Sequence, residues 1–317
     1  MSDAVKKLLG KKVKDMKLRK DMGVGELVDE MRDAGGFTAR HLAIGVSILE
    51  EMLSDRECTN FLSFPACVVA TGLRGVLAQF VKEFDVVITT GGTFDHDLAR
   101  AWGGCYFHGS FELDDEMLHR MGVNRLGNVL IPNSSYGMLL ETKMFPILKE
   151  LSKKKEEWSS RELAYEFGRR VSDENSILYQ AAKHKIPVYC PGILDAAFGT
   201  NLVIFSQDNN FKLNLMRDEK ELSDIVFDSK RRGALMIGGG ISKHHTIWWN
   251  QFKGGLDYAV YITTATAYDG SLSGARLREA ISWGKVKEKA KQVTVDGDAT
   301  VMLPIMLAAL RRKLIKA

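Results

Sequence analysis

Short runs of apolar and β-branched residues recur through most of this chain, with helical stretches between them. The clearest runs lie at 85–90, 186–190, 202–205, 234–237 and 258–263. Apolar strands that alternate with helices are typical of an α/β fold, in which helices cover both faces of a mostly parallel sheet. We therefore predict a doubly wound, mostly parallel sheet in which each of these runs is a strand.

The predicted helices begin ahead of the first strand. Residues 24–33 and 40–53 have amphipathic patterns typical of helices. A third helix is predicted at 159–171, where Ser159 is followed three residues later by Glu162, the spacing of a capping box.

Charge and composition are even over most of the chain. The net charge of +4, from 44 Lys and Arg against 40 Asp and Glu, gives no reason to expect nucleic acid or an anionic membrane as a partner. Basic residues concentrate in the first twenty positions, which we interpret as a solvated arm. Without repeats or a low-complexity linker, we expect a single domain over 1–317, with a basic helical arm at 1–60 and a sheet-containing core at 61–317.

The four cysteines, Cys58, Cys67, Cys105 and Cys190, do not have CxxC spacing. We therefore expect buried thiols in a reducing cytoplasm and no bound metal. The chain has no run of 18 apolar residues and no apolar signal segment at its start, so we also expect no membrane association.

Glycine and threonine cluster where three of the predicted strands end, at 89–92, 237–240 and 262–265. In doubly wound sheets, ligands bind outside the carboxyl ends of the strands. Glycines there let the backbone approach a phosphate, and a helix N-terminus favours an anion. The triple glycine at 238–240 is weak support by itself, since it also fits a tight turn, and no GxGxxG fingerprint is present.

Two polar clusters allow a structural or a functional interpretation. His244 and His245 begin a predicted helix, where they could be satisfied by a cap or act as a general base on an amine. Metal binding is poorly supported, because adjacent helical residues point to different sides. Asp95, His96 and Asp97 could complement a helix N-terminus or form a polar wall that recognises a cation.

One lysine near the C-terminus stands out by its surroundings. Lys285 follows Ile281, Trp283 and a glycine, with Glu279 six residues upstream. An isolated lysine is usually a surface residue, but one desolvated against Trp283 would have a lowered pKa. Its neutral amine could then attack an imine or carbonyl carbon.

Several motifs together resemble the deoxyhypusine synthase family: Glu279-Ala-Ile-Ser-Trp-Gly-Lys285, Gly238-Gly-Gly-Ile-Ser-Lys-His-His245 and Gly270-Ser-Leu-Ser-Gly-Ala275. Segments 123–133 and 186–195 are also similar to the family. The resemblance extends from about Val13 to the final helix, and residues 12–75 are most similar to archaeal members.

The resemblance implies a Rossmann-like α/β fold, bound NAD and a homotetramer with active sites across tight dimer interfaces. In the family's reaction, NAD takes a hydride from spermidine, and an enzyme lysine captures the aminobutyl group as an imine with release of diaminopropane. A lysine of the translation initiation factor 5A precursor then displaces the enzyme lysine, and NADH reduces the new imine.

Site residues follow from the resemblance by position. Lys285 resembles the imine-forming lysine, and His244 the histidine that contacts spermidine and assists proton removal. The positions implied to bind substrate are Asp95, His96, Thr200, Gly270, Ser271, Ser273, Glu279 for an ammonium and Trp283 for the methylene stem. The positions implied to contact NAD are Ala66, Cys67, Val68, Val69, Ala70, Thr90, Gly91, Gly92, Asp195, Gly239, Thr264, Ala265, Asp298 and Ala299.

The sequence also departs from the eukaryotic pattern. Thr200 and Leu272 stand where that pattern has aspartates, Asp95 and His96 replace two acids, and Ala66-Cys67 replaces a Ser-Asn pair. Because a buried ammonium needs a carboxylate partner, the same chemistry could act on another amine, as in homospermidine synthases or with agmatine as donor. A non-catalytic paralogue that binds factor 5A is a further alternative, which the retention of Lys285 disfavours.

Overall fold

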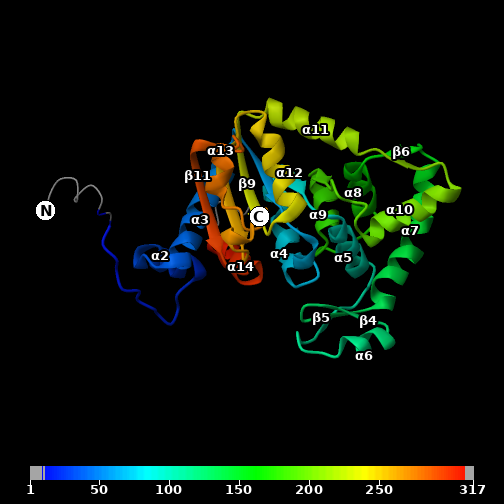
Figure 1. The fold of residues 1–317 in the computed structure, drawn as a ribbon, viewed down its shortest axis with the longest axis horizontal. Helices are drawn as coiled ribbons and strands as arrows, with labels where there is room; N and C mark the ends of the chain where they lie inside the picture. Colours follow the sequence, from blue (N-terminus) through cyan, green and yellow to red (C-terminus); the bar gives the residue numbers. More distant parts are fainter. Residues whose placement is uncertain (1–8, 10, 311–317) are drawn as a thin grey trace.

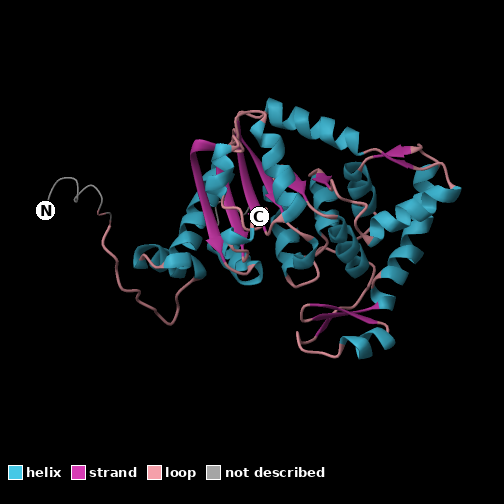
Figure 2. Cartoon of the chain, viewed as in Figure 1, coloured by secondary structure: helices cyan, strands magenta, loops and turns pink. Residues whose placement is uncertain are grey.

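The computed structural model describes residue 9 and residues 11–310 of the chain (Figure 1). Lys6 and Lys7 of the expected basic arm lie outside the described residues. The predicted α/β class is confirmed, because helices flank a parallel sheet on both sides (Figure 2).

The main sheet has six parallel strands in the order β11-β10-β9-β1-β2-β7. Their bounds are β1 Cys58–Ser63, β2 Val86–Ile88, β7 Val188–Tyr189, β9 Arg231–Ile237, β10 Leu256–Thr263 and β11 Val286–Asp296. The strands predicted at 85–90, 186–190, 234–237 and 258–263 are confirmed as β2, β7, β9 and β10. Strand β11 was not predicted, because three lysines and one glutamate interrupt its apolar pattern at the sheet edge.

The sheet separates two hydrophobic layers, because successive strand residues point to opposite faces. On β9, Leu235 and Ile237 contribute to the larger layer, and Ala234 and Met236 to the smaller one. The larger layer packs under α3 Phe37–Ser54, α4 Leu73–Phe80, α5 Gly91–Ala101, α9 Ile177–His184 and α14 Ala299–Ala309. The smaller layer packs under α11 Leu215–Asp228, α12 Gly240–Gln251 and α13 Leu277–Ser282.

The N-terminal helices agree with the sequence patterns. The predicted helix 24–33 is confirmed as α2 Val24–Ala34, and 40–53 is confirmed within α3. Helix α3 buries Leu42, Leu49 and Met52 in the larger hydrophobic layer, so it is built into the core. The central strand β1 spans the boundary between residues 60 and 61 that we expected between arm and core.

The remaining helices and strands adjoin the end of the sheet formed by β2 and β7. Helices α7 Gly137–Ser152, α8 Ser160–Gly168 and α10 Ala197–Asp208 accompany a short parallel pair, β6 Glu157–Trp158 and β8 Lys212–Leu213. The capping box predicted for 159–171 is confirmed at the start of α8, where Ser159 and Glu162 bond each other's backbone amides. A small antiparallel sheet projects from the body beside α6 Asp115–Arg120, with β3 Phe107–His108, β4 Val123–Leu126 and β5 Val129–Pro132 (Figure 1).

The strand predicted at 202–205 is wrong, because these residues lie inside helix α10. Leu202 and Phe205 are buried, whereas Val203 and Ile204 are 49% and 47% exposed, which is the spacing of one helical face. A short apolar run fits both structures, and here tertiary contacts select the helix.

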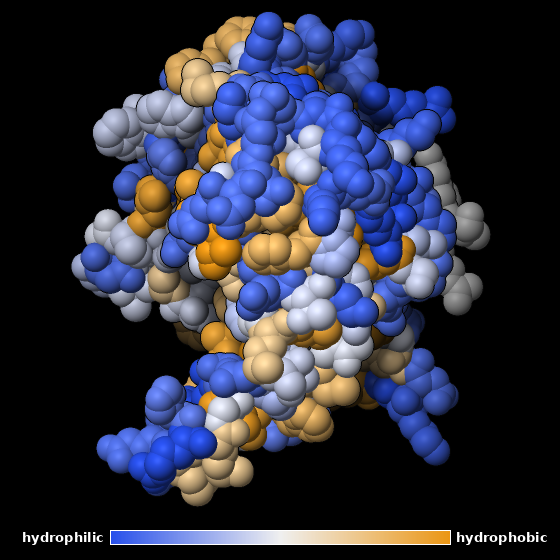
Figure 3. All heavy atoms as spheres, turned by 90° about the vertical axis from the view of Figure 1, so that its right-hand side faces the viewer, coloured by the Kyte–Doolittle hydropathy of each residue, from blue (hydrophilic) through white to orange (hydrophobic). Residues whose placement is uncertain are grey.

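Viewed from the side of α7 and α10, the surface shows hydrophobic patches among hydrophilic residues (Figure 3).

Two further expectations concern cysteines and membranes. Cys58 and Cys190 are buried as predicted, but Cys67 and Cys105 are exposed. Cys67 lies in the short 3-10 helix Ala66–Val68 after β1, and Cys105 lies in the loop after α5. Among the described residues, no helix combines the length and apolarity needed to cross a membrane. The same residues contain no cluster of three side chains suited to hold a metal ion.

Candidate active site

Each of the six parallel strands is followed closely by a segment that we expected to contact NAD. Because the strands are parallel, these segments all lie at the carboxyl edge of the sheet. In chain order they are 66–70 after β1, 90–92 after β2, Asp195 after β7, Gly239 after β9, Thr264 and Ala265 after β10, and Asp298 and Ala299 after β11.

Close backbone contacts join these segments along the edge. The Ala66 amide donates to Thr90 Oγ1 over 3.0 Å. A Cβ atom on Gly92 would lie 2.8 Å from that of Ala66, and one on Gly91 would lie 2.5 Å from that of Ala196. Larger residues therefore do not fit at these two glycines without movement of the neighbouring segment.

Two helix N-termini at this edge have no side-chain cap. Helix α5 begins after Thr90 and α12 begins after Gly239, and neither preceding residue caps its helix with a side chain. In contrast, Asp298 caps α14 by accepting a hydrogen bond from the Thr300 amide. Free amide groups and the helix dipole favour an anion, so α5 and α12 could each hold a phosphate of a dinucleotide.

A cavity of about 450 Å³ adjoins the expected cofactor segments 66–70 and 298–299. Its wall includes Ala70, Gly72, Arg100, Tyr106 and Thr300. The guanidinium of Arg100 donates to the carbonyls of Val69 and Thr71, and it thereby fixes the segment after β1. Glycine turns, uncapped helices and this cavity fit a dinucleotide at the carboxyl edge of the sheet.

Lys285 lies at the opposite end of the strands from the expected cofactor segments, immediately before the amino end of β11. Its side chain is 8% exposed, and its Nζ atom lies 5.5 Å and 5.3 Å from the ring centroids of Trp248 and Trp283. It borders a cavity of about 140 Å³ between α12 and α13. The apolar residues around this cavity are Ile247, Leu272, Ala275, Ala280 and Trp283, and the charged ones are Lys243, Arg276, Glu279 and Lys285.

The structure separates the two adjacent histidines. His244 packs against Trp248, with ring centroids 5.5 Å apart, on the side of α12 that faces Lys285. Burial, and then the positive charge of Lys285, lower the pKa of His244, so its imidazole is neutral and able to accept a proton near neutral pH. His245 instead contacts Glu219 of α11, with Nε2 3.2 Å from a carboxylate oxygen.

Lys243 is a residue of this cavity to which sequence reasoning assigned no role. It is 2% exposed, and its ammonium donates to the carbonyls of Leu272 and Ala275 over 2.7 Å and 2.6 Å. Burial lowers its pKa to about 8, although Glu279 acts in the opposite direction. Its place directly before His244 and His245 was visible in the sequence, but its burial was not.

The loop at 270–275 connects the two parts of the site. Leu272 lines the cavity of Lys285, while Ser273 approaches the turn after β9 so closely that a Cβ on Gly239 would lie 2.0 Å from Ser273 Oγ. Gly270 and Ser271 are exposed at the tip of this loop. Thr200 lies elsewhere, exposed on α10, where its hydroxyl donates to the Ala196 carbonyl of its own helix.

Asp95, His96 and Asp97 are all buried, and both acids complement helix N-termini of other elements. Asp95 accepts from the amides of Ala197 and Phe198 at the start of α10. Asp97 accepts from the amides of Ile177 and Leu178 at the start of α9. The structural interpretation therefore holds, with the correction that the acids cap α9 and α10 rather than their own helix α5.

His96 is held beside two tyrosines. Its Nδ1 atom lies 2.8 Å from the hydroxyl of Tyr106, and its ring packs 5.2 Å from that of Tyr136. Burial lowers the pKa of His96 to about 4. The hydroxyl of Tyr136 donates to Asp95, so His96 and Asp95 belong to one buried polar cluster.

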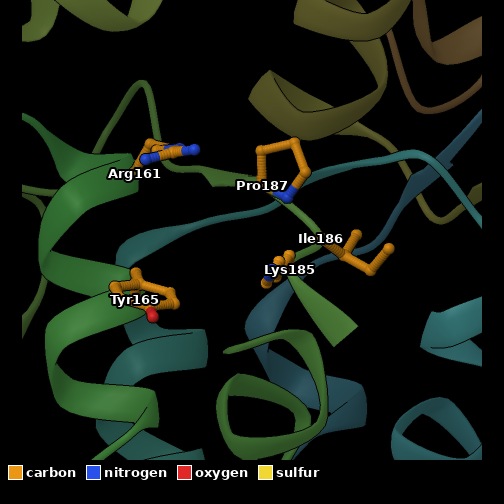
Figure 4. Close-up of a pocket in the computed structure, with 5 residues that line it drawn as sticks. All are labelled: Arg161, Tyr165, Lys185, Ile186 and Pro187. Atoms are coloured by element: carbon orange, nitrogen blue, oxygen red, sulfur yellow. The ribbon is translucent and has the colours of Figure 1, made fainter. Parts of the chain in front are cut away.

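Two other cavities share no lining residue with the region of Lys285. One of about 200 Å³ is bordered by Arg161, Tyr165, Lys185, Ile186 and Pro187 (Figure 4). The other, of about 400 Å³, has a mixed charged lining that includes Arg161, Glu162 and Arg217. Neither contains a residue expected to bind substrate or cofactor.

The fold and this site define an α/β protein with a dinucleotide-type carboxyl edge of the sheet and a buried lysine in a cavity near the amino end of β11. Comparisons with known proteins assign it more narrowly. The family model "DS: Deoxyhypusine synthase" matches residues 26–310. A "Probable deoxyhypusine synthase" of Picrophilus torridus is 53% identical over 304 residues, covering 95% of this chain and 97% of the relative. The one of Sulfurisphaera tokodaii is 52% identical over 305 residues, covering 96% and 98%.

Solved structures agree in fold. A crystal structure from Entamoeba histolytica, assigned as a deoxyhypusine synthase, superposes with a TM-score of 0.66 at 18% identity, covering 94% of this chain and 96% of that one. A complex of AgrE with ornithine and NAD⁺ has a TM-score of 0.53 at 13% identity and covers 86% of this chain and 34% of AgrE, which is a likeness of fold alone. The chain belongs to the deoxyhypusine synthase family.

Proposed function

We propose that this protein is an NAD-dependent deoxyhypusine synthase that transfers the aminobutyl group of spermidine to a lysine of the translation initiation factor 5A precursor. The observation that carries the proposal is the buried amine of Lys285, which lies between two indole rings in a cavity that also contains Glu279. Membership of the family supports the same reaction.

Bound NAD would supply the hydride acceptor for oxidation of the amine and the hydride donor for the final reduction. The residues that fit it are the glycine turns after β2 and β9, with the uncapped starts of α5 and α12 facing its phosphates. Asp195 and Asp298, which follow β7 and β11, offer carboxylates to ribose hydroxyls at the same edge.

Lys285 performs the covalent chemistry. Once a base has removed its proton, the amine attacks the imine carbon of the oxidised substrate, the bond from that carbon to the diaminopropane nitrogen breaks, and diaminopropane leaves as a free amine. The lysine of factor 5A then attacks the new imine on Lys285 and releases the enzyme amine. No net oxidation remains once this product imine is reduced.

The neighbouring side chains bind the amine and move its proton. His244, neutral at physiological pH, accepts the proton of the substrate nitrogen during oxidation. Glu279 attracts an ammonium, and Trp283 and Trp248 provide aromatic faces for the methylene stem and the charged end. The other expected substrate positions, Asp95, His96, Thr200, Gly270, Ser271 and Ser273, are not all near Lys285 within one chain.

Assembly into a homotetramer would complete the site. Trp248, Phe252 and Trp283 are large apolar residues exposed beside Lys285, and Trp248 and Phe252 lie on consecutive turns of α12. A second copy that covers this stripe would bury it and close the cavity. Multi-angle light scattering should give the mass of four chains, and Phe252→Glu should reduce that mass. A monomer in the wild type would contradict the assembly.

A second candidate function keeps the chemistry and changes the amine. Glu279 is the only carboxylate that lines the cavity of Lys285 among the described residues, because Leu272 stands at one aspartate position and Thr200 bonds its own helix. Fewer carboxylates favour a less highly charged donor or acceptor, such as agmatine or a free diamine. Formation of a small-molecule product with either compound would support this candidate.

The decisive experiment is the intact mass of an archaeal factor 5A precursor after incubation with this protein, NAD and spermidine in the cytoplasmic pH range. We expect the gain of one aminobutyl group with the wild type and none with Lys285→Ala. Lys287→Ala is the matched control, because Lys287 pairs with Asp257 over 2.6 Å and does not line the cavity. Full transfer by Lys285→Ala would rule out the lysine-imine route.

A further inference from the structure

Lys243 occupies a place in the site that needs an explanation. It lies in the first turn of α12 directly before His244, and its ammonium is buried within the wall of a cavity proposed to receive a cationic amine. A cation there repels such a substrate, and burial of an ammonium costs free energy unless its protons are satisfied. The benefit that offsets these costs should therefore be visible in its contacts.

Both hydrogen bonds that the Lys243 ammonium donates go to the loop at 270–275. Its Nζ atom donates to the carbonyls of Leu272 and Ala275 and lies 3.7 Å from the ring centroid of Tyr261 on β10. Two carbonyls and an aromatic face satisfy the buried ammonium. The ammonium is thus bound to the loop carbonyls, although Lys243 also lines the cavity.

Two more buried donors hold the same loop. The hydroxyl of Tyr261 donates to the Ser273 carbonyl over 2.6 Å, and Thr263 Oγ1 donates to the same oxygen over 2.9 Å. The carbonyls of residues 272, 273 and 275 therefore all accept hydrogen bonds from side chains of α12 and β10. We call Lys243, Tyr261 and Thr263 the loop clamp.

The clamped loop has two functional neighbours. On one side Ser273 fills the space next to Gly239, at the expected cofactor edge. On the other side Leu272 lines the cavity of Lys285, and the chain continues from Ala275 directly into α13, which carries Glu279. Any shift of the loop would change the position of Leu272 and Glu279 relative to His244 and Lys285.

The geometry points to Lys243 as a positioning residue: as part of the loop clamp, it fixes the 270–275 loop between the cofactor edge and the amine cavity and so sets the shape of the amine site. This inference rests on the proposed function for its kinetic consequence. The structural consequence, a loop ordered by Lys243, is independent of what the enzyme transfers.

The test is Lys243→Met in the full-length protein, since methionine keeps the chain length and removes all three N–H donors. We expect amide hydrogen exchange at 271–275 to accelerate by about tenfold or more, because the loop loses two buried hydrogen bonds. The KM for spermidine should rise by about tenfold while NAD affinity and the global melting temperature change little. Borohydride should still trap an adduct on Lys285 at high amine concentration.

Lys287→Met is the matched control and should leave loop exchange and KM unchanged. Unchanged exchange and KM in Lys243→Met would overturn the inference. If Lys243→Met does not fold, the double variant Tyr261→Phe with Thr263→Val removes both donors to Ser273 and should give the same faster exchange; unchanged loop exchange in that variant would equally overturn it. If the wild type transfers no aminobutyl group, the proposed function fails, and loop exchange alone still decides the role of Lys243.

Discussion

The amine nitrogen of Lys285 lies 5.5 Å from the ring centroid of Trp248, which projects from α12 one turn after His244. The indole ring thus contacts both the proposed nucleophile and the proposed base. This three-residue arrangement joins the start of β11 to the middle of α12, and it is the geometric centre of the candidate site.

Replacement of Trp248 should therefore impair the amine site. In Trp248→Leu the apolar volume is largely retained but the ring face is lost, and we expect kcat/KM for the amine to fall about tenfold. Trp249→Phe is the control, because the Trp249 indole donates to Glu219 on the opposite side of the helix. Equal losses in both variants would argue against a specific role for Trp248.

The adjacent histidines should differ in function. Because the pKa of His244 is lowered from 6.5, its basic form persists below that pH, and the acidic limb of kcat/KM should lie there. His244→Gln should lower kcat/KM about 100-fold and abolish this limb. His245→Gln removes only a contact to Glu219 and should keep the wild-type pH profile. A profile unchanged in His244→Gln would assign the base elsewhere.

Asp97 should be essential for stability. Its carboxylate accepts from Arg74 Nε over 2.6 Å, from Ser176 Oγ over 2.8 Å and from two amides of α9. Asp97→Asn leaves the buried Arg74 without this charge partner and should cost about 3–5 kcal/mol in the free energy of unfolding. Asp115→Asn, which breaks an exposed pair with Arg125, should change chemical denaturation little. Similar midpoints for the two variants would contradict this prediction.

His96 should make stability depend on pH. Burial, and then the charge of Arg100, lower its pKa to about 4 from 6.5. Between these values the unfolded chain binds a proton that the folded protein excludes, so the free energy of unfolding falls as pH falls from 6.5 towards 4. The contribution is at most about 3 kcal/mol. Denaturation series should show a shallower slope in His96→Asn than in a variant of the exposed His119; identical slopes would refute the effect.

Local sequence patterns predicted much of the sheet and one helix cap. Strands β2, β7, β9 and β10 follow from short apolar runs that end at glycine, threonine or proline. The capping box at Ser159 and Glu162 needs only neighbouring residues, so it was predictable without tertiary information. The resemblance to a family likewise depends on residues close together in the chain.

Long-range contacts decided the rest. The run at 202–205 became a helix because Asp95, more than a hundred residues away, caps α10 and because alternate sides of that helix meet core and solvent. Strand β11 was not predicted because it lies at the sheet edge, where charged residues interrupt the alternation of apolar and polar residues that indicates a strand. The direction in which His244 and His245 diverge follows from the packing of α12 between α11 and α13.

The sequence by itself therefore determined the fold class, the strand-end glycines and the candidate lysine, because these depend on local period and residue type. Only the tertiary structure decided that Lys285 lies near the rings of Trp248 and Trp283 and that Lys243 donates to loop carbonyls. It also decided that the carboxylates of Asp95 and Asp97 cap the N-termini of α10 and α9. Each of these depends on side chains brought together by burial of the two hydrophobic layers, which a linear pattern does not specify.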